Sequence, residues 1–179
     1  FCLSRGLGDV YKRQVQLIMI FREATPEDAR FIIENTVSLI NEVWELQKEH
    51  KYQFDVEGLT NELWSRMSDP HKTFDWIIGE LDGKPALTFK LTQMFNWKLN
   101  EKTLVIGRFF LNKNFRGRKS FIVEIRNYLE SYGKKKGAPK FTGTIDKENE
   151  VSKRFFLKDW DTGCLLYTSD AADEEDSGD

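Results

Sequence analysis

The strongest candidate for chemistry is the basic turn "FRGRKS" at residues 115–120. Its cationic side chains, Arg116, Arg118 and Lys119, surround Gly117, and a glycine lets the backbone approach a ligand closely. If a helix begins directly after the turn, its unpaired N–H groups and positive dipole end also attract an anion. The residues therefore favour a phosphate or pyrophosphate site. The alternative is a solvated basic turn that only caps a helix.

A strand and a helix must position this turn. Residues 103–111 are predicted to form the strand, with Gly107 in its interior, where a glycine often marks a bulge or a close backbone approach. An ordinary strand with a packing glycine is the alternative. After the turn, apolar residues at helical spacing predict a helix that ends near Gly137. These residues are Phe121, Ile125, Tyr128 or Leu129, and Tyr132.

The rest of the chain supplies the other elements of one domain. A short strand at 19–25 leads into a helix with Thr25 as N-cap and Pro26 at its first position, running to about residue 50. A second helix, at 55–68, is followed by strands at 74–78 and 87–91 on either side of an Asp82-Gly83 turn. A strand at 140–146 and a helix at 148–158 complete the order β-α-α-β-β-β-α-β-α. This order predicts an α/β (α+β) fold with a mixed, mostly antiparallel sheet covered on both faces.

The two ends of the chain resemble translated DNA adapters. Residues 9–14, "DVYKRQ", are encoded by GAT-GTG-TAT-AAG-AGA-CAG, and residues 164–169, "CLLYTS", by TGT-CTC-TTA-TAC-ACA-TCT. With a shift of frame these are opposite strands of one element, similar to the mosaic end of transposase adapters used for sequencing libraries. We therefore expect 1–14 and 164–179 to be artefacts and 15–163 to be a single domain cut short at Gly163. The alternative is a basic leader and a disordered acidic tail.

Setting the flanks aside changes what the composition implies. Both cysteines, Cys2 and Cys164, lie in the flanks, so residues 15–163 have no thiol for a disulfide or a metal site, which fits a reducing cytoplasm. Of 27 basic and 29 acidic residues, three and seven lie in the flanks, which leaves 24 and 22 and a net charge of +2 instead of −2. Such a balance argues against nucleic-acid binding as the main role. No apolar run is long enough to span a bilayer, and no metal site is expected.

The element order resembles that of the Gcn5-related N-acetyltransferase (GNAT) family over residues 18–160. Arg22, Ala24 and Asp28 match the family's early pattern R-x-A-x-x-x-D, and the basic turn stands where the family has R/Q-x-x-G-x-G/A. The resemblance implies a GNAT-like fold and binding of acetyl-CoA as co-substrate. The family continues into a final strand beside the fifth, a place filled here by the adapter-like residues 164–169.

The resemblance also implies which residues bind acetyl-CoA. Arg116 matches the first motif residue and Gly117 a glycine of a looser form, whereas Lys119 and Phe121 stand where the family has small residues. Each of these two side chains must point away from the ligand or narrow its site. Asn149 resembles an asparagine that contacts the pantetheine arm, with a helix-entry role as the alternative. The expected binding residues are Phe109, Leu111, Arg116, Gly117, Arg118, Lys119, Ser120, Phe121 and Asn149.

The family's usual proton-transfer groups are missing, so the sequence assigns no catalytic residue. The strand at 103–111 has no glutamate, and Arg108 lies near the position where the family has one. The tyrosine position of the last helix falls on Phe155 or Phe156. Three alternatives follow: catalysis rests on positioning, with water carrying protons, or it uses a substitute group, or the domain binds its ligand without catalysis. The substitutes available are Glu80, Tyr128 and Tyr132.

The sequence therefore predicts a cytoplasmic acyl-CoA-dependent N-acyltransferase that moves an acetyl group to an amine of unknown size. Acceptor pockets in this family are lined by the first helices and the strand meander, where Trp64, Trp76 and Phe95 lie. A non-catalytic acyl-CoA-binding module of the same fold is the alternative function. A third hypothesis is nucleic-acid binding through the basic turn and the lysines at 134–136.

Overall fold

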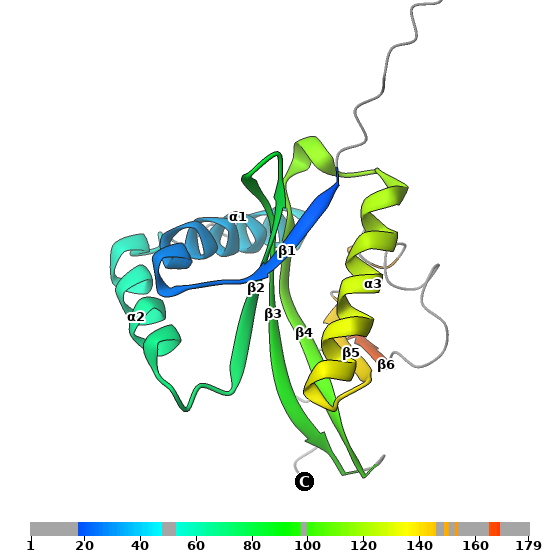
Figure 1. Cartoon of the computed structure of the whole chain (residues 1–179). Coiled ribbons are helices and arrows are strands. Elements are labelled where there is room, and N and C mark those ends of the chain that lie inside the picture. The colour runs from blue at the N-terminus through cyan, green and yellow to red at the C-terminus, as the bar shows by residue number, and fades with distance from the viewer. Residues whose placement is uncertain are drawn as a thin grey trace, which may run out of the picture.

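The fold is one mixed sheet with helices on both faces (Figure 1). The computed structural model describes residues 18–47, 53–97, 100–145, 149–150, 153 and 165–168. In these ranges the strands lie in the order β1-β2-β3-β4-β5-β6. Neighbouring strands from β1 to β4 are antiparallel to one another, and β5 is parallel to both β4 and β6. The predicted fold class is confirmed.

The elements agree with the predicted order as far as the fifth strand. The strands are β1 (Met19–Glu23), β2 (Phe74–Leu81), β3 (Lys84–Asn96), β4 (Glu101–Leu111), β5 (Lys140–Ile145) and β6 (Leu165–Thr168). The helices are η1 (Pro26–Asp28), α1 (Ala29–Gln47), α2 (Val56–Ser68), η2 (Lys113–Phe115) and α3 (Lys119–Lys136). Most of the helix predicted at 148–158 lies outside the described residues. Strand β6 falls within the adapter-like segment, whose origin stays a prediction.

Two apolar layers hold the helices on the sheet. On one face, α3 presents the predicted Phe121, Ile125, Leu129 and Tyr132 to the sheet. On the other face, Trp76 and Ile78 of β2 pack against Ile32 of α1 and Met67 of α2. Because β2 is buried on both faces, its side chains do not show the inside–outside alternation of an exposed strand. Within the described ranges, no helix has both the length and the apolar character needed to cross a membrane.

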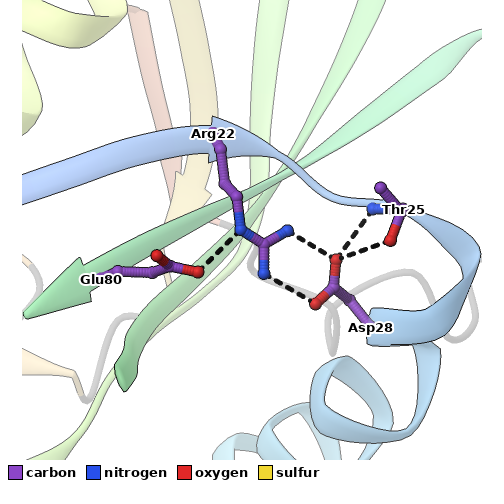
Figure 2. Close-up of polar contacts among 4 residues, drawn as sticks. All are labelled: Arg22, Thr25, Asp28 and Glu80. Carbon is purple, nitrogen blue, oxygen red and sulfur yellow. Dashed lines mark hydrogen bonds and ion pairs between the residues drawn. The ribbon is translucent and has the colours of Figure 1, made fainter. Parts of the chain in front are cut away.

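Arg22 fixes the junction where the chain leaves β1 for the first helices (Figure 2). Its guanidinium donates two hydrogen bonds to Asp28, at 2.7 and 2.8 Å, and one to Glu80 of β2, at 2.7 Å. Asp28 also accepts the N–H of Thr25 at 2.8 Å, as expected of an N-terminal cap. The hydrogen bond from Arg22 lowers the pKa of Asp28 against the opposing effect of burial. The R-x-A-x-x-x-D pattern therefore has a structural role here.

Candidate functional site

The end of β4 separates from its parallel neighbour. Pairing between β4 and β5 covers Thr103–Ile106 and Lys140–Gly143, whereas pairing between β4 and β3 continues to Leu111. Strand β5 continues past Gly143 to Ile145, and from Thr142 onward its other edge pairs with β6. The last part of β4 therefore still pairs with β3 on one side, but it no longer pairs with the described strand β5 on the other side. The edge of a strand that its sheet neighbour leaves can pair with amide groups of a ligand.

A β-bulge marks the point of separation. Thr88 of β3 pairs with Phe110 and Lys90 pairs with Gly107, so β4 has one residue more than β3 between these pairs. The prediction of a bulge beside Gly107 is confirmed, but the left-handed residue is Arg108, with φ of 53°. Left-handed backbone costs a residue with a side chain about 1–2 kcal/mol. Strained backbone of this kind gathers at functional sites, and a bulge also bends its strand.

The basic turn has the geometry that the sequence predicts. After η2, Gly117 takes a left-handed φ of 82°, which explains the glycine, and α3 begins at Lys119. The N-cap residue Arg118 makes no side-chain hydrogen bond to the helix. The N–H of Phe121 donates to the Arg118 carbonyl at 3.2 Å. The N–H groups of Lys119 and Ser120, in the first helical turn, have no partner within their own helix and are suited to an anion.

Helix α1 ties this turn down through Glu42. Arg116 reaches the Glu42 carboxylate at 3.0 Å, and Lys113 reaches it at 3.4 Å. Arg116 Nε also donates to the carbonyl oxygen of Leu111 at 2.8 Å. The charge of Arg116 is therefore partly neutralised, and the residue acts as a brace between β4, the turn and α1. Sequence reasoning missed Glu42, because it is far from the turn along the chain.

Arg118 is an exposed cation of the turn. Its guanidinium lies over the rings of Phe115 and Phe121, at 5.9 and 5.6 Å from their centroids. Among the described residues it forms no ion pair, which distinguishes it from Arg116. The side chain of Lys119 lies outside the described part. Arg118 is thus the described side chain best placed to meet an anion at the start of α3.

Three of the expected binding residues turn their side chains toward the core. Phe121 is 1% exposed and packs edge-on against Phe115, so its side chain points away from the turn surface. Phe109 and Leu111 are partly buried and pack against the same core as α3. Phe121 can therefore meet a ligand only through its backbone, whereas the side chains of Phe109 and Leu111 stay partly accessible. Phe121 stands where the family has a small residue, and its side chain points away from the candidate ligand site instead of narrowing it.

Asn149 stands at the start of a helical turn. Its carbonyl accepts the N–H of Lys153 at 3.0 Å, which is the bonding pattern of a helix entry. Contact with a ligand remains compatible with this position. The neighbouring Phe155 and Phe156, at the family's tyrosine position, lie outside the described residues.

The three substitute proton-transfer groups, Glu80, Tyr128 and Tyr132, make other contacts in the structure. Glu80 is bound to Arg22, and the Tyr132 hydroxyl donates to Asp75, which also accepts from Lys136 at 3.0 Å. Burial and then the hydrogen bond to Asp75 raise the pKa of Tyr132. Burial likewise raises the pKa of Tyr128, which stacks on Phe21. Neither tyrosine is therefore prepared to lose its proton near neutral pH, and the carboxylate of Glu80 is held by Arg22.

The expected acceptor residues do not lie together. Trp76 is buried on the face that α1 and α2 cover, and Trp64 on α2 is half exposed. Phe95 instead lines a hollow of about 540 Å³ beside Lys136, at the end of α3. Neither tryptophan lines this hollow, so a shared acceptor pocket of Phe95 and the two tryptophans stays a prediction. The described residues hold no cluster of three or more metal-ligating side chains.

Comparison with solved structures identifies the fold. A possible acetyltransferase from Clostridium difficile 630 is 19% identical, with a TM-score of 0.62, over 85% of this chain and 97% of that one. A predicted acetyltransferase from Clostridium acetobutylicum, solved with acetyl-CoA, is 14% identical, with a TM-score of 0.56, over 81% and 93%. Glucosamine-6-phosphate N-acetyltransferase from Arabidopsis thaliana is 18% identical, with a TM-score of 0.52, over 76% and 88%. No family model and no curated protein sequence matches the chain. At these identities the likeness shows the fold, which is the GNAT fold.

Proposed function

We propose that the chain is an acyl-CoA-dependent N-acyltransferase that moves an acetyl group from acetyl-CoA to an amine. The observation that carries the proposal is the end of β4, which bulges at Arg108, leaves β5 after Ile106 and leads through Gly117 into the start of α3. A strand edge suits the amides of a pantetheine arm, and a helix N-terminus suits a pyrophosphate. The acetyltransferase neighbours, one of them solved with acetyl-CoA, support the same reading.

In this proposal the backbone binds most of the co-substrate. Phe109 and Leu111 offer peptide groups to the pantetheine amides, and Gly117 lets the N–H groups of Lys119 and Ser120 approach the pyrophosphate. The side chains of Arg118 and Lys119 add charge, the backbone of Phe121 completes the helix start, and Asn149 contacts the pantetheine arm. Arg116 serves as a positioning residue, since Glu42 and the Leu111 carbonyl hold its guanidinium.

The chemistry breaks the acetyl C–S bond and forms a C–N bond, while the amine loses a proton and the thiolate gains one. Among the described residues, Glu80 and Tyr132 are bound elsewhere, and Tyr128 lies against Phe21. We therefore infer that the protein acts by holding the amine against the thioester while water carries the protons. Proximity of this kind is worth about 7–11 kcal/mol of barrier.

Because the substitute groups Glu80, Tyr128 and Tyr132 are bound elsewhere or buried in the described part of the chain, a second candidate is an acyl-CoA-binding module that does not turn its ligand over. The two candidates share the site and differ in one measurable step. Incubation of the full chain with acetyl-CoA and a panel of amines distinguishes them, because only the enzyme releases free thiol in proportion to amine. Binding with no amine-dependent thiol release supports the module.

Calorimetry of the full chain with acetyl-CoA, desulfo-CoA and a short DNA duplex tests the site itself. We expect both coenzyme A compounds to bind and the duplex not to bind. Failure of both compounds to bind at millimolar concentration would refute the enzyme and the module together, and tight DNA binding would favour the nucleic-acid hypothesis.

Paired charge reversals locate the site on α3. Arg118→Glu with Lys119→Glu should weaken acetyl-CoA binding at least ten-fold, because two charge-assisted contacts become repulsive. Lys134→Glu with Lys135→Glu is the matched control, since it makes the same change at the other end of the same helix. Equal affinity in the two double variants would show that the turn does not hold the pyrophosphate.

A further inference from the structure

Lys90 is a partly buried lysine in the centre of the sheet. It lies between Trp76 of β2 and Gly107 of β4, which are its partners across the two strand pairs. Its Nζ lies 4.6 Å from the centre of the Phe74 ring, on the face that α1 and α2 cover. No carboxylate of the described residues forms an ion pair with Lys90. A charge in this position costs desolvation free energy that no neighbouring anion offsets.

Two arginines add to the positive charge at this place. The guanidinium of Arg66, on α2, lies 5.5 Å from the centre of the same Phe74 ring. Arg108 is the strained bulge residue next to Gly107. Burial, and then the charges of Arg66 and Arg108, lower the pKa of Lys90. Among the described residues, the one ion pair of this group joins Arg66 to Glu62 at 3.7 Å on the helix surface, so the positive charge is in excess there.

There is room and further hydrogen-bonding capacity beside Lys90. A Cβ on Gly107 would meet no atom within 4 Å, so the position opposite Lys90 borders open space. On the same face, the Trp76 indole N–H and the Thr88 hydroxyl are buried and have no hydrogen-bond partner in the described part. Buried donors without partners are rare in native proteins and point to a missing acceptor.

We infer that this cationic cluster, formed by Arg66, Lys90 and Arg108, binds an anionic group of the acyl acceptor. The inference rests on the proposed function, because it takes the bulge as the place where the thioester would lie. The acceptor is then an amine that also carries a carboxylate or a phosphate. The anion contacts the cluster on the α1 and α2 face, and this contact sets the position of the amine beside the end of β4.

A kinetic test uses amines that differ only in an anionic group. Ethanolamine is compared with phosphoethanolamine, and glycinamide with glycine, in the full chain with saturating acetyl-CoA. We expect kcat/KM to be at least ten-fold higher for the charged member of one pair. The pair that shows this preference identifies the anionic group of the acceptor as a phosphate or as a carboxylate. Lys90→Met should lower the ratio of kcat/KM between the charged and the uncharged amine by about ten- to a hundred-fold, which is the loss expected for one hydrogen bond between charged groups.

Two further variants keep the test sharp. Lys84→Met removes a lysine from the exposed start of the same strand and should leave the preference unchanged. Arg108→Gly relieves the left-handed strain, so it should be at least as stable as the wild type to urea and still lose preference for the anion. A preference that survives both Lys90→Met and Arg108→Gly would overturn the inference.

A binding test covers the case in which no amine of the panel is a substrate. The chain, labelled with ¹³C at lysine Cε and saturated with desulfo-CoA, is titrated by NMR with inorganic phosphate and with acetate. We expect the Lys90 signal, assigned from Lys90→Met, to shift and saturate in the millimolar range, whereas Lys84 does not. A Lys90 signal that moves no more than that of Lys84 contradicts the inference.

Acetyl-CoA affinity keeps the two proposals apart. Lys90→Met should bind acetyl-CoA as the wild type does, because the cluster is assigned to the acceptor. A loss of acetyl-CoA affinity in this variant would mean that a coenzyme A phosphate occupies the cluster, which overturns the inference and leaves the proposed function standing. If acetyl-CoA does not bind even to the wild type, the proposed function fails, and the Lys90 titration still reports on the anion site.

Discussion

Replacing Gly117 by alanine separates the shape of the basic turn from its charge. Gly117 has a left-handed φ of 82°, and a Cβ there would meet no atom within 4 Å. The change therefore adds no clash and acts through backbone strain. The strain destabilises the folded state by about 1–2 kcal/mol. Alanine also reduces the conformational entropy of the unfolded chain, which offsets about 0.4–1 kcal/mol of this cost. The free energy of unfolding should therefore fall by about 1 kcal/mol. For a chain of this size, Tm should fall by about 2–4 °C.

The same strain should weaken acetyl-CoA binding if the turn presents the start of α3 to the ligand. A penalty of about 1 kcal/mol on the competent conformation raises Kd roughly five-fold, and more if the new methyl group touches the ligand. Calorimetry with acetyl-CoA measures this change, and urea unfolding measures the stability.

Gly137→Ala is the matched control. Gly137 has a φ of 66°, also borders open space, and lies at the opposite end of α3. It should lose about the same stability as Gly117→Ala, about 1 kcal/mol, and keep the wild-type Kd. If Gly117→Ala also keeps the wild-type Kd, or if both variants lose affinity equally, the turn does not act as argued.

Three other changes test the surrounding structure. Asp28→Ala should lower the free energy of unfolding in urea by about 2 kcal/mol, a figure already reduced because Arg22 is partly exposed. The control, Glu34→Ala, breaks an exposed ion pair and should cost less than about 0.5 kcal/mol. Equal costs in the two variants would contradict the role of Asp28. Since folding lowers the pKa of Asp28, its contribution should be complete above the ordinary value of 3.8 and be lost as pH falls through the lower folded value. Tyr132→Phe should cost about 1 kcal/mol and leave amine-dependent thiol release unchanged; a lost rate would make Tyr132 the missing acid. Gly107→Val should fill the space beside Lys90, lowering transfer to a charged amine without changing acetyl-CoA affinity, and unchanged transfer would place the acceptor elsewhere.

Local signals in the sequence predicted most of the fold. The cap formed by Thr25 and Asp28 and the turn at Asp82-Gly83 depend on residues close in the chain, and both form as expected. The strand–turn–helix order around Gly117 is local in the same sense. These features follow from backbone preferences and hydrogen bonds within a few residues, which a sequence displays directly.

The parts of the site that escaped prediction depend on tertiary contacts. Glu42 reaches Arg116 across 74 positions of the chain, and nothing near either residue in the sequence indicates the pair. Lys90 interrupts a buried strand, but its proximity to Arg66 and Arg108 depends on how α2 and β4 pack on that strand. The bulge was expected at Gly107, since glycine is the usual residue for unusual backbone, whereas the structure places the left-handed conformation on Arg108.

The position of Arg108 connects the two halves of the candidate site. Gly107 does not adopt a positive φ, whereas the next residue, Arg108, does. A glycine at position 108 would therefore remove the strain. An arginine there costs about 1–2 kcal/mol in backbone strain and adds repulsion to Lys90. Both costs are understandable if the guanidinium meets an anion beside the place where β4 opens. Pyrophosphate binding at the start of α3 and anion binding at the bulge would then position donor and acceptor from opposite ends of the same short stretch of β4.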